Sequence, residues 1–425
     1  MLQIDIRIEE IPNTFARFRA IVNESHWLKR VKIVRQRIRD NPFLEQYLLS
    51  ESSVAFAFAY CSELVAQYGR IPDTQIGNRS IYPAIGFATQ VLSILETSTE
   101  QQKNALIRRI HGAIKNPYDM RAMQLEMLAA THFTRRGYKI RWPETEGIGT
   151  FDLLVDGIGS NGLEVECKSI SNDKGRKIHN HEALEFHNYL APHLKEIAEN
   201  LNTGLAVVMT IPGRLPTAIK ARRDLATRVK DQILAAQSLS LNDEAGIRIT
   251  EFAPAQLIDV NSFHRNANTR MFVDQITATN NRESIIVGGA RGGVVIFVMQ
   301  SRQDDSFLKS VFGTLSDSAR TQVTGTRAAQ FFVGFQGIDS DGLLRTAQQD
   351  ADPNQGPTQL ARDVSKFLNS ADRPHVVGVG FVSQSERIDS KDNLVENRGT
   401  VYNFLKNEST YWHNDFKGMF GQLKW

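Results

Sequence analysis

Hydrophobic and polar positions divide the chain into three regions, of which the first is helical. The stretch "SSVAFAFAYCSELVAQYG" (52–69) is apolar through most of a helix and ends at a glycine. Two further helices, broken near "TST", are indicated over 84–115. No chemical motif accompanies them, so the pattern predicts a helical accessory domain over residues 1–117.

Strand patterns begin in the second region, residues 118–240. A helix is predicted over "DMRAMQLEMLAATHFTRRG", and three short strands follow at "YKIRW", "GTFDLLVDG" and "LEVECKSI". Next come a helix over "HEALEFHNYLAPHLKEIAENL", a buried strand "TGLAVVMTIPG" and a basic helix from about 217 to 237. The order α-β-β-β-α-β-α predicts a mixed sheet flanked by helices, an α/β fold.

The third region, residues 241–425, has a less regular pattern. "ESIIVGGARGGVVIFVMQS" predicts two strands around a glycine-rich turn, further strands are indicated at "TRAAQFFVGFQGI" and "RPHVVGVGFVSQS", and helices at 305–325 and 357–369. This α+β region either extends the central sheet or forms a third domain.

Composition limits the class of protein without naming a function. The chain has 425 residues, 41% of them hydrophobic and 23% charged, which is ordinary for a globular protein. No apolar run approaches the length of a membrane span, and the N-terminus lacks the layout of a signal peptide. The two cysteines cannot form a disulfide framework or a structural zinc site, which favours a reducing, cytoplasmic location.

Charge is unevenly distributed although the formal net charge is only +3. Basic residues gather in "HWLKRVKIVRQRIRD" (26–40), which includes Lys32 and Arg35, and in the helix near 217–237, which includes Arg222 and Arg223. Such clusters suit contacts with a phosphate backbone. The alternative for each cluster is a solvated helix face.

Charged residues lie inside two predicted strands whose other residues are mostly apolar, and their presence there needs an explanation. Because strand side chains alternate in direction, Asp152 lies opposite the apolar face of its strand, and Glu166 and Lys168 lie opposite the apolar face of the next one. Two carboxylates repel unless a cation separates them, and Mg²⁺ or Mn²⁺ prefers oxygen ligands. Carboxylates and a lysine around one divalent ion suit phosphodiester hydrolysis.

The helix Glu126, the strand Asp152 and the strand Glu166-x-Lys168 resemble the motif of the PD-(D/E)xK nuclease superfamily, over residues of about 118–213. The family's proline before the aspartate is Phe151 here. The resemblance implies a restriction-endonuclease-like αβββαβ core, and Mg²⁺ (or Mn²⁺) held by Glu126, Asp152 and Glu166. It further implies that Lys168 assists the attacking water. It suggests a DNA endonuclease of a defence or restriction type, for which cutting both strands would favour a homodimer.

Several alternatives remain open from the residues alone. Glu164 shares the strand face of Glu166, but only Glu166 has the E-x-K spacing. On the following helix, Lys177, His181 and Glu185 are candidates for contact with the scissile phosphate. The substrate could also be RNA or branched DNA, and an inactive nucleic-acid-binding or assembly protein could keep the same fold.

Overall fold

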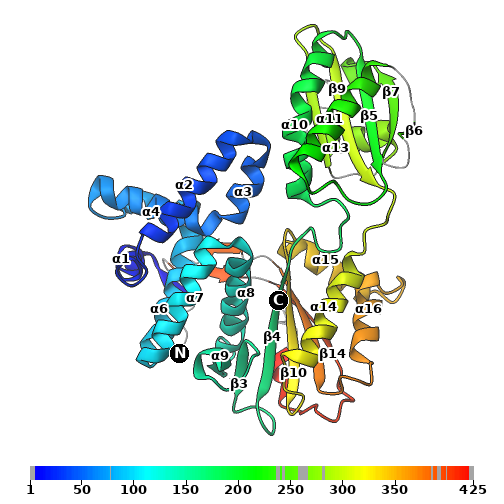
Figure 1. Cartoon of the computed structure of the whole chain (residues 1–425). Coiled ribbons are helices and arrows are strands. Elements are labelled where there is room, and N and C mark those ends of the chain that lie inside the picture. Colours follow the sequence, from blue (N-terminus) through cyan, green and yellow to red (C-terminus); the bar gives the residue numbers. More distant parts are fainter. Residues whose placement is uncertain are drawn as a thin grey trace. The chain divides into compact units, whose positions relative to one another are not determined.

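The computed structural model is a mixed α/β structure in two compact units (Figure 1). It describes residues 5–76, 78–235, 240–241, 245–256, 267–279, 283–383, 386–389, 394–398 and 400–420. The first unit comprises residues 1–34, 49–174 and 308–425, and the second comprises 35–48 and 175–307. The second unit is therefore largely an insertion into the first.

The first unit is built on a six-stranded mixed sheet. Its strand order is β14-β11-β10-β4-β3-β2, formed by β2 (Lys139–Arg141), β3 (Leu153–Asp156), β4 (Leu163–Ile170), β10 (Ala328–Phe335), β11 (Val376–Val382) and β14 (Val401–Leu405). The central strand β4 pairs in parallel with β10 and antiparallel with β3. A separate three-stranded sheet joins β1 (Asp5–Arg7), β13 (Leu394–Arg398) and β12 (Glu386–Asp389).

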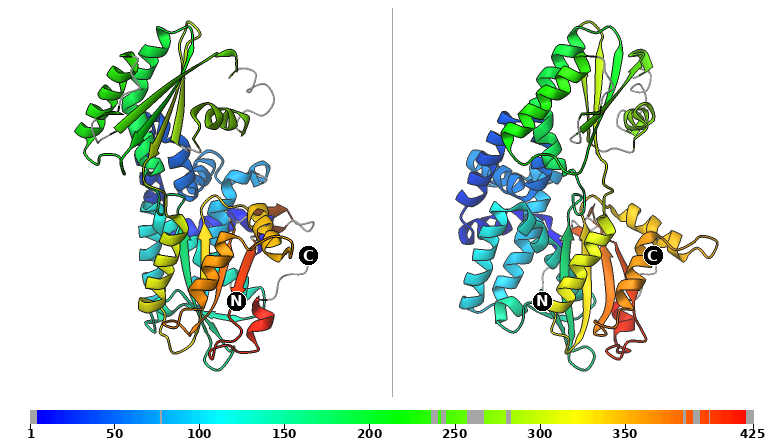
Figure 2. Two further views of the ribbon diagram at one scale, coloured as in Figure 1. Left: turned by 90° about the vertical axis from the view of Figure 1, so that its right-hand side faces the viewer. Right: turned by 45° about the vertical axis from the view of Figure 1, so that its right-hand side comes forward.

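Helices cover both faces of the six-stranded sheet (Figure 2). Leu125 and Phe133 of α8 (Pro117–Thr134) pack on the face that carries Val165 and Cys167 of β4. The opposite face carries Phe331, which contacts Phe367 of α16 (Gln359–Leu368), and α14 (Phe307–Thr321) lies on the same side, its Phe312 also against Phe367. The first unit also contains the helices α9 (Pro143–Glu146), α15 (Ser340–Ala351) and α17 (Phe416–Phe420).

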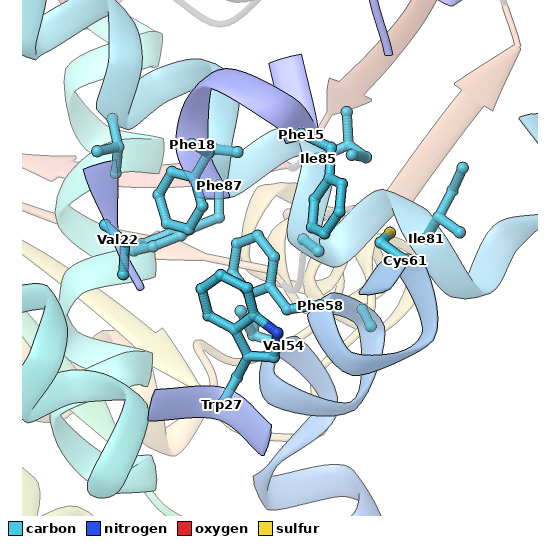
Figure 3. Close-up of a cluster of buried hydrophobic side chains, with 14 of the residues drawn as sticks. Phe15, Phe18, Val22, Trp27, Val54, Phe58, Cys61, Ile81, Ile85 and Phe87 are labelled. Carbon is cyan, nitrogen blue, oxygen red and sulfur yellow. The ribbon is translucent and has the colours of Figure 1, made fainter. Parts of the chain in front are cut away.

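The N-terminal helices share one apolar core, which Met120, Met123 and Met127 of α8 join. Phe18 stacks on Phe58 with ring centroids 4.7 Å apart, and Trp27 stacks on Phe58 at 5.0 Å (Figure 3). The Trp27 indole donates a hydrogen bond to Ser62, so burial of this ring leaves no polar group unsatisfied. The helices that contribute to it are α1 (Ile11–Ile21), α2 (Ser25–Asp40), α4 (Ser53–Tyr68), α5 (Asp73–Ile76), α6 (Tyr82–Thr97) and α7 (Glu100–Lys115), whereas α3 (Glu45–Glu51) of the same region does not. The predicted helical character of this region is confirmed.

Local sequence signals fix the elements that carry the site. Asn116 caps α8 by accepting a hydrogen bond from the Tyr118 amide, and Pro117 occupies the first helical position. The β3–β4 turn needs Gly162, whose φ is +83° and where a Cβ would lie 2.9 Å from the Val155 carbonyl oxygen. This turn sets the antiparallel register of β3 on β4.

The second unit is a five-stranded mixed sheet with helices on both faces. Its strand order is β6-β7-β5-β9-β8, formed by β5 (Gly204–Ile211), β6 (Ser240–Leu241), β7 (Ala245–Phe252), β8 (Glu283–Gly288) and β9 (Val294–Ser301). Side chains of α10 (Asn180–Glu199) and α11 (Ile219–Leu234) form the core on one face, and Val273 of α13 (Ala267–Thr277) packs on the other.

The structure corrects the predicted domain boundaries at 117 and 240. The first helix and three strands predicted for the second region lie in the first unit, but the helix and strand predicted to complete their core, α10 and β5, belong to the second unit. The strand beside β4 is β10, from the third region. Of the two possibilities for 241–425, β10, β11 and β14 extend the central sheet, whereas β7, β8 and β9 belong to the second unit.

Within the described ranges no single helix is long and apolar enough to cross a membrane, and only the bent pair Pro42–Glu51 and Ser53–Tyr68 meets that test jointly, with 85° between its helices.

Candidate active site

Glu166 and Lys168 lie side by side on β4, on the face turned away from α8. Glu166 is 1% exposed, and the Lys168 ammonium donates to its Oε1 at 2.5 Å. The same ammonium donates to Oε1 of Gln322 at 2.6 Å. Gln322 directly follows α14, so the lysine is held between its own strand and a helix from the other side of the insertion.

Asp152 enters this arrangement through the main chain of β4. The β3–β4 ladder begins at the pair Leu153 and Val165, so the main chain of Asp152 lies just outside it. Beyond the end of the ladder, the side chain of Asp152 bonds to β4 in place of its main chain: Oδ2 accepts a hydrogen bond of 2.7 Å from the Cys167 amide. The Asp152 carboxylate is thereby fixed at the residue that separates Glu166 from Lys168.

Glu126 approaches from α8 and is bound to a residue that the sequence did not single out. It is 2% exposed, and its Oε1 accepts a hydrogen bond from Arg109 of α7. Arg109 also lies 3.3 Å from Oε2 of Glu144 in α9. Thr99 begins α7 with a capping box that includes Gln102, and α7 packs along α8, which places Arg109 beside Glu126.

Burial, together with repulsion from neighbouring carboxylates, raises the pKa of each of these carboxyl groups. Burial, followed by the charge of Asp152, raises the pKa of Glu126 to about 8 and that of Glu166 to about 7. Burial also raises the pKa of Asp152, against the lowering effect of its bond to the Cys167 amide. Asp152 therefore acts electrostatically on both glutamates and links the two halves of the site.

The donor chemistry fits a hard divalent cation, whereas the present side-chain conformations do not yet enclose one. Oε2 of Glu126 and Oε2 of Glu166 are buried and have no hydrogen-bond partner. Oxygen donors of this kind suit Mg²⁺ or Mn²⁺. Among the residues that the structure describes, however, no three His, Cys, Asp or Glu side chains form a group that could hold a metal ion. Glu126 extends from α8 and Glu166 from β4, and the charge of Asp152 acts on both carboxyl groups.

Glu164, the rival of Glu166, has a structural role. Its carboxylate is fully buried and accepts hydrogen bonds from the amide of Thr324 at 2.8 Å and from the Thr324 hydroxyl at 2.5 Å. Arg327 lies 3.7 Å away. Glu164 thus fastens the α14–β10 connection to β4, and the E-x-K spacing identifies the less satisfied glutamate of the pair.

The residues predicted to contact nucleic acid are distributed over both units. Lys32 and Arg35 of α2 are exposed, as is Arg223 of α11, which lies over the Tyr189 ring. Arg222 is a correction: it is 6% exposed and is bonded to Glu185 and to the Pro216 carbonyl, because its side chain faces the interior of the second unit.

The remaining candidates, Lys177 and His181, lie in the second unit. The backbone amide of Lys177 bonds Asp305 at 2.9 Å, and the His181 ring contacts Arg37 at 2.6 Å and Glu185 at 3.4 Å. Their side chains and those of the first unit's carboxylates belong to different compact units.

Sequence reasoning missed Arg109, Glu144 and Gln322. Arg109 lies on an ordinary amphipathic helix, and Gln322 stands far along the chain from Lys168, so neither carries a local signal. Glu144 follows Pro143 in a short helix between β2 and β3. Only the packing of α7 on α8 and the return of α14 to the sheet identify these residues.

Comparisons with known proteins add no assignment: no family, no curated protein and no solved structure matches the chain.

Proposed function

We propose that the protein is a metal-dependent nuclease of the PD-(D/E)xK type that hydrolyses phosphodiester bonds in DNA. The observation that carries the proposal is the Asp152 carboxylate bound to the Cys167 amide, between Glu166 and Lys168. A structural charge cluster would need neither an aspartate docked on the motif strand nor buried carboxylate oxygens without partners.

The order of elements in the first unit supports the same proposal. Along this unit the chain runs α8, β2, the four-residue helix α9, β3, β4, α14 and β10, with the second unit inserted between β4 and α14. Apart from α9, this is the α-β-β-β-α-β order of a restriction-endonuclease-like core. In that core the second helix would be α14 and the fourth strand β10, not the α10 and β5 that follow β4 in the sequence.

The chain's own residues would divide the chemistry between metal binding and positioning of the water. Asp152 and Glu166, with Glu126, would hold the metal. Bound there, a divalent cation would supply charge stabilisation for the phosphate and lower the pKa of a water. Lys168, held by Gln322 and Glu166, has a third ammonium proton left to orient a water or to donate to a phosphate oxygen.

The substrate part of the proposal depends on exposed basic residues. Lys32, Arg35 and Arg223 offer positive charge for backbone contacts. RNA and branched DNA present the same backbone chemistry, so they are included as substrates in the test. The competing function is a nucleic-acid-binding or assembly protein without activity, and the engagement of Glu126 by Arg109 is the observation that favours it.

The test is a cleavage and metal-binding assay on wild type, Glu166→Gln and Lys168→Met. Plasmid, linear, single-stranded and branched DNA and RNA are each incubated with Mg²⁺, Mn²⁺ or EDTA. We expect metal-dependent cleavage by wild type and a loss of at least about 100-fold in both variants. Glu164→Gln is the matched control, because it removes a buried carboxylate from the same strand face.

Glu164→Gln should lower the melting temperature, since Thr324 and Arg327 lose a charged partner, while metal binding persists and cleavage falls far less than in the Glu166 and Lys168 variants. Absence of cleavage on every substrate, with no rise in wild-type melting temperature in Mg²⁺ or Mn²⁺, would support the inactive binding protein instead.

A further inference from the structure

We propose that Arg109 is an internal counterion that occupies the carboxylate site in the metal-free protein and must leave Glu126 when a divalent cation binds. The inference rests on the proposed function, because it takes the metal site to be formed by Glu126, Asp152 and Glu166.

The first support is the contact pattern of Arg109. One guanidinium nitrogen, Nη2, donates to Oε1 of Glu126, and the other, Nη1, lies 3.3 Å from Oε2 of Glu144. The charge of Asp152 also acts on the guanidinium, as do those of both glutamates. Arg109 thus forms an ion pair with Glu126 of α8, as Lys168 does with Glu166 of β4.

The second support is the charge balance of the site. Four carboxyl groups, on Glu126, Glu144, Asp152 and Glu166, face two basic groups, on Arg109 and Lys168. Fully ionised, the cluster has two negative charges in excess: burial of this excess goes with the raised pKa of Glu126 and Glu166, and one divalent cation would balance it with both glutamates ionised. Without that cation, the buried Oε2 atoms of Glu126 and Glu166 have no partner.

The third support is that Arg109 and a metal ion exclude one another electrostatically. A divalent cation bound to Glu126 would lie next to the guanidinium that bonds the same carboxylate, and the like charges repel. Arg109 has somewhere to go: its side chain is 30% exposed, and Glu144 is 63% exposed and already touches the second nitrogen. Rotation of the flexible arginine stem toward Glu144 would free Glu126 without uncovering a buried charge.

The consequence is a lower affinity of the site for a metal ion. Metal affinity would be lower than the carboxylates alone provide, because part of the binding free energy displaces Arg109. The residue acts through Glu126 and is a positioning residue, not a catalytic one.

The experiment compares Mn²⁺ binding to wild type, Arg109→Gln and Arg108→Gln by titration calorimetry, without nucleic acid, and by the Mn²⁺-induced rise in melting temperature. Arg108 is the matched control, since it is the exposed neighbour on α7 and its substitution changes net charge equally. We expect about 10-fold tighter Mn²⁺ binding by Arg109→Gln and no change in Arg108→Gln.

Three results would overturn the inference. Unchanged or weaker binding by Arg109→Gln, with wild-type binding intact, would remove Arg109 as a competitor and leave the proposed function standing. Equal tightening in Arg108→Gln would assign the effect to net charge. No Mn²⁺ binding by folded wild type would reject the metal site itself, and with it both proposals.

A second measurement needs no variant to fold. Phenylglyoxal modification of Arg109 in the wild type, followed by mass spectrometry, reports its accessibility with and without saturating Mn²⁺. We expect faster modification of Arg109 in Mn²⁺, with Arg108 as the internal reference. Equal or slower modification of Arg109 would contradict displacement.

Discussion

At the scale of single residues, buried ionisable groups in this protein differ in how far they are satisfied. Glu164 is bonded through both oxygens, whereas Glu166 and Glu126 each keep one oxygen without a partner. His187 is the extreme case, because both ring nitrogens are buried and unpartnered. The unsatisfied groups are those for which we expect a ligand or a pH effect.

His187 makes the second unit sensitive to acid. Burial between Phe43 and Phe297 lowers the pKa of its imidazole to about 4, whereas the unfolded chain takes up the proton near pH 6.5. The unfolded state therefore binds more protons between these values, so the contribution is complete above about pH 6.5 and is lost as the pH falls toward 4. The loss reaches about 3 kcal/mol at most.

Amide hydrogen exchange of α10 and β9 peptides between pH 4 and 7, corrected for intrinsic exchange rates, measures this effect. His187→Leu should keep the apolar packing and flatten the pH dependence of protection. A variant that loses protection toward pH 4 as steeply as wild type would show that another group causes the acid sensitivity.

At the scale of secondary structure, the end of a helix completes the site. α14 buries Val311 and Leu315 and ends at Thr321, so that Gln322 reaches the Lys168 ammonium. The Glu164–Thr324 bonds fix the chain just beyond this point. The lysine is thus positioned by an element that is remote in sequence and adjacent in space.

Under the proposed nuclease function, Gln322→Leu should lower turnover about 10-fold, since the charged Lys168 ammonium loses its hydrogen bond to the Gln322 side chain. Gln322→Glu keeps an acceptor and should retain more activity at the pH where wild type is active. The measurement is kcat and KM over a pH series. A change in KM alone, or equal losses in both variants, would mean that Gln322 does not position Lys168.

At the scale of the whole molecule, the second unit interrupts a sheet that is complete without it. The two connections run together: the Ser306 amide bonds the Gly175 carbonyl at 3.0 Å, and the Lys177 amide bonds Asp305. Both flanks carry site residues, because β4 precedes the insertion and α14 follows it. Lys168 and Gln322 are therefore far apart in the sequence but in direct contact in the fold.

A shortened protein in which two glycines replace residues 176–304 should fold, because the chain ends to be joined already lie at hydrogen-bond distance. Phe43, which packs on the core of the second unit, is changed to Ser to keep the product soluble. Cooperative thermal unfolding and an Mn²⁺-induced stabilisation like that of the full chain are expected. A shortened protein without cooperative unfolding would show that the first unit depends on the second.

The sequence by itself determined the parts that depend on local periodicity. Alternation along β3 and β4 places Val165 and Cys167 on the α8 side and Glu166 and Lys168 on the other, and the structure has this arrangement. Helical spacing gave the N-terminal helices, and α14 and α16 fall within the predicted ranges 305–325 and 357–369. Each of these features follows from residues close together in the chain.

Only the tertiary structure decided which strand lies beside β4 and which residues complete the site. β5 and β10 are both eight-residue apolar strands, and buried and half-buried residues follow one another in the same order along the two strands. A local pattern cannot distinguish two such partners, because strand pairing depends on the faces that the whole fold must cover. Arg109 and Gln322 likewise reach the site only through the tertiary structure. The packing of α7 on α8 brings Arg109 to Glu126, and the return of α14 after the insertion brings Gln322 to Lys168.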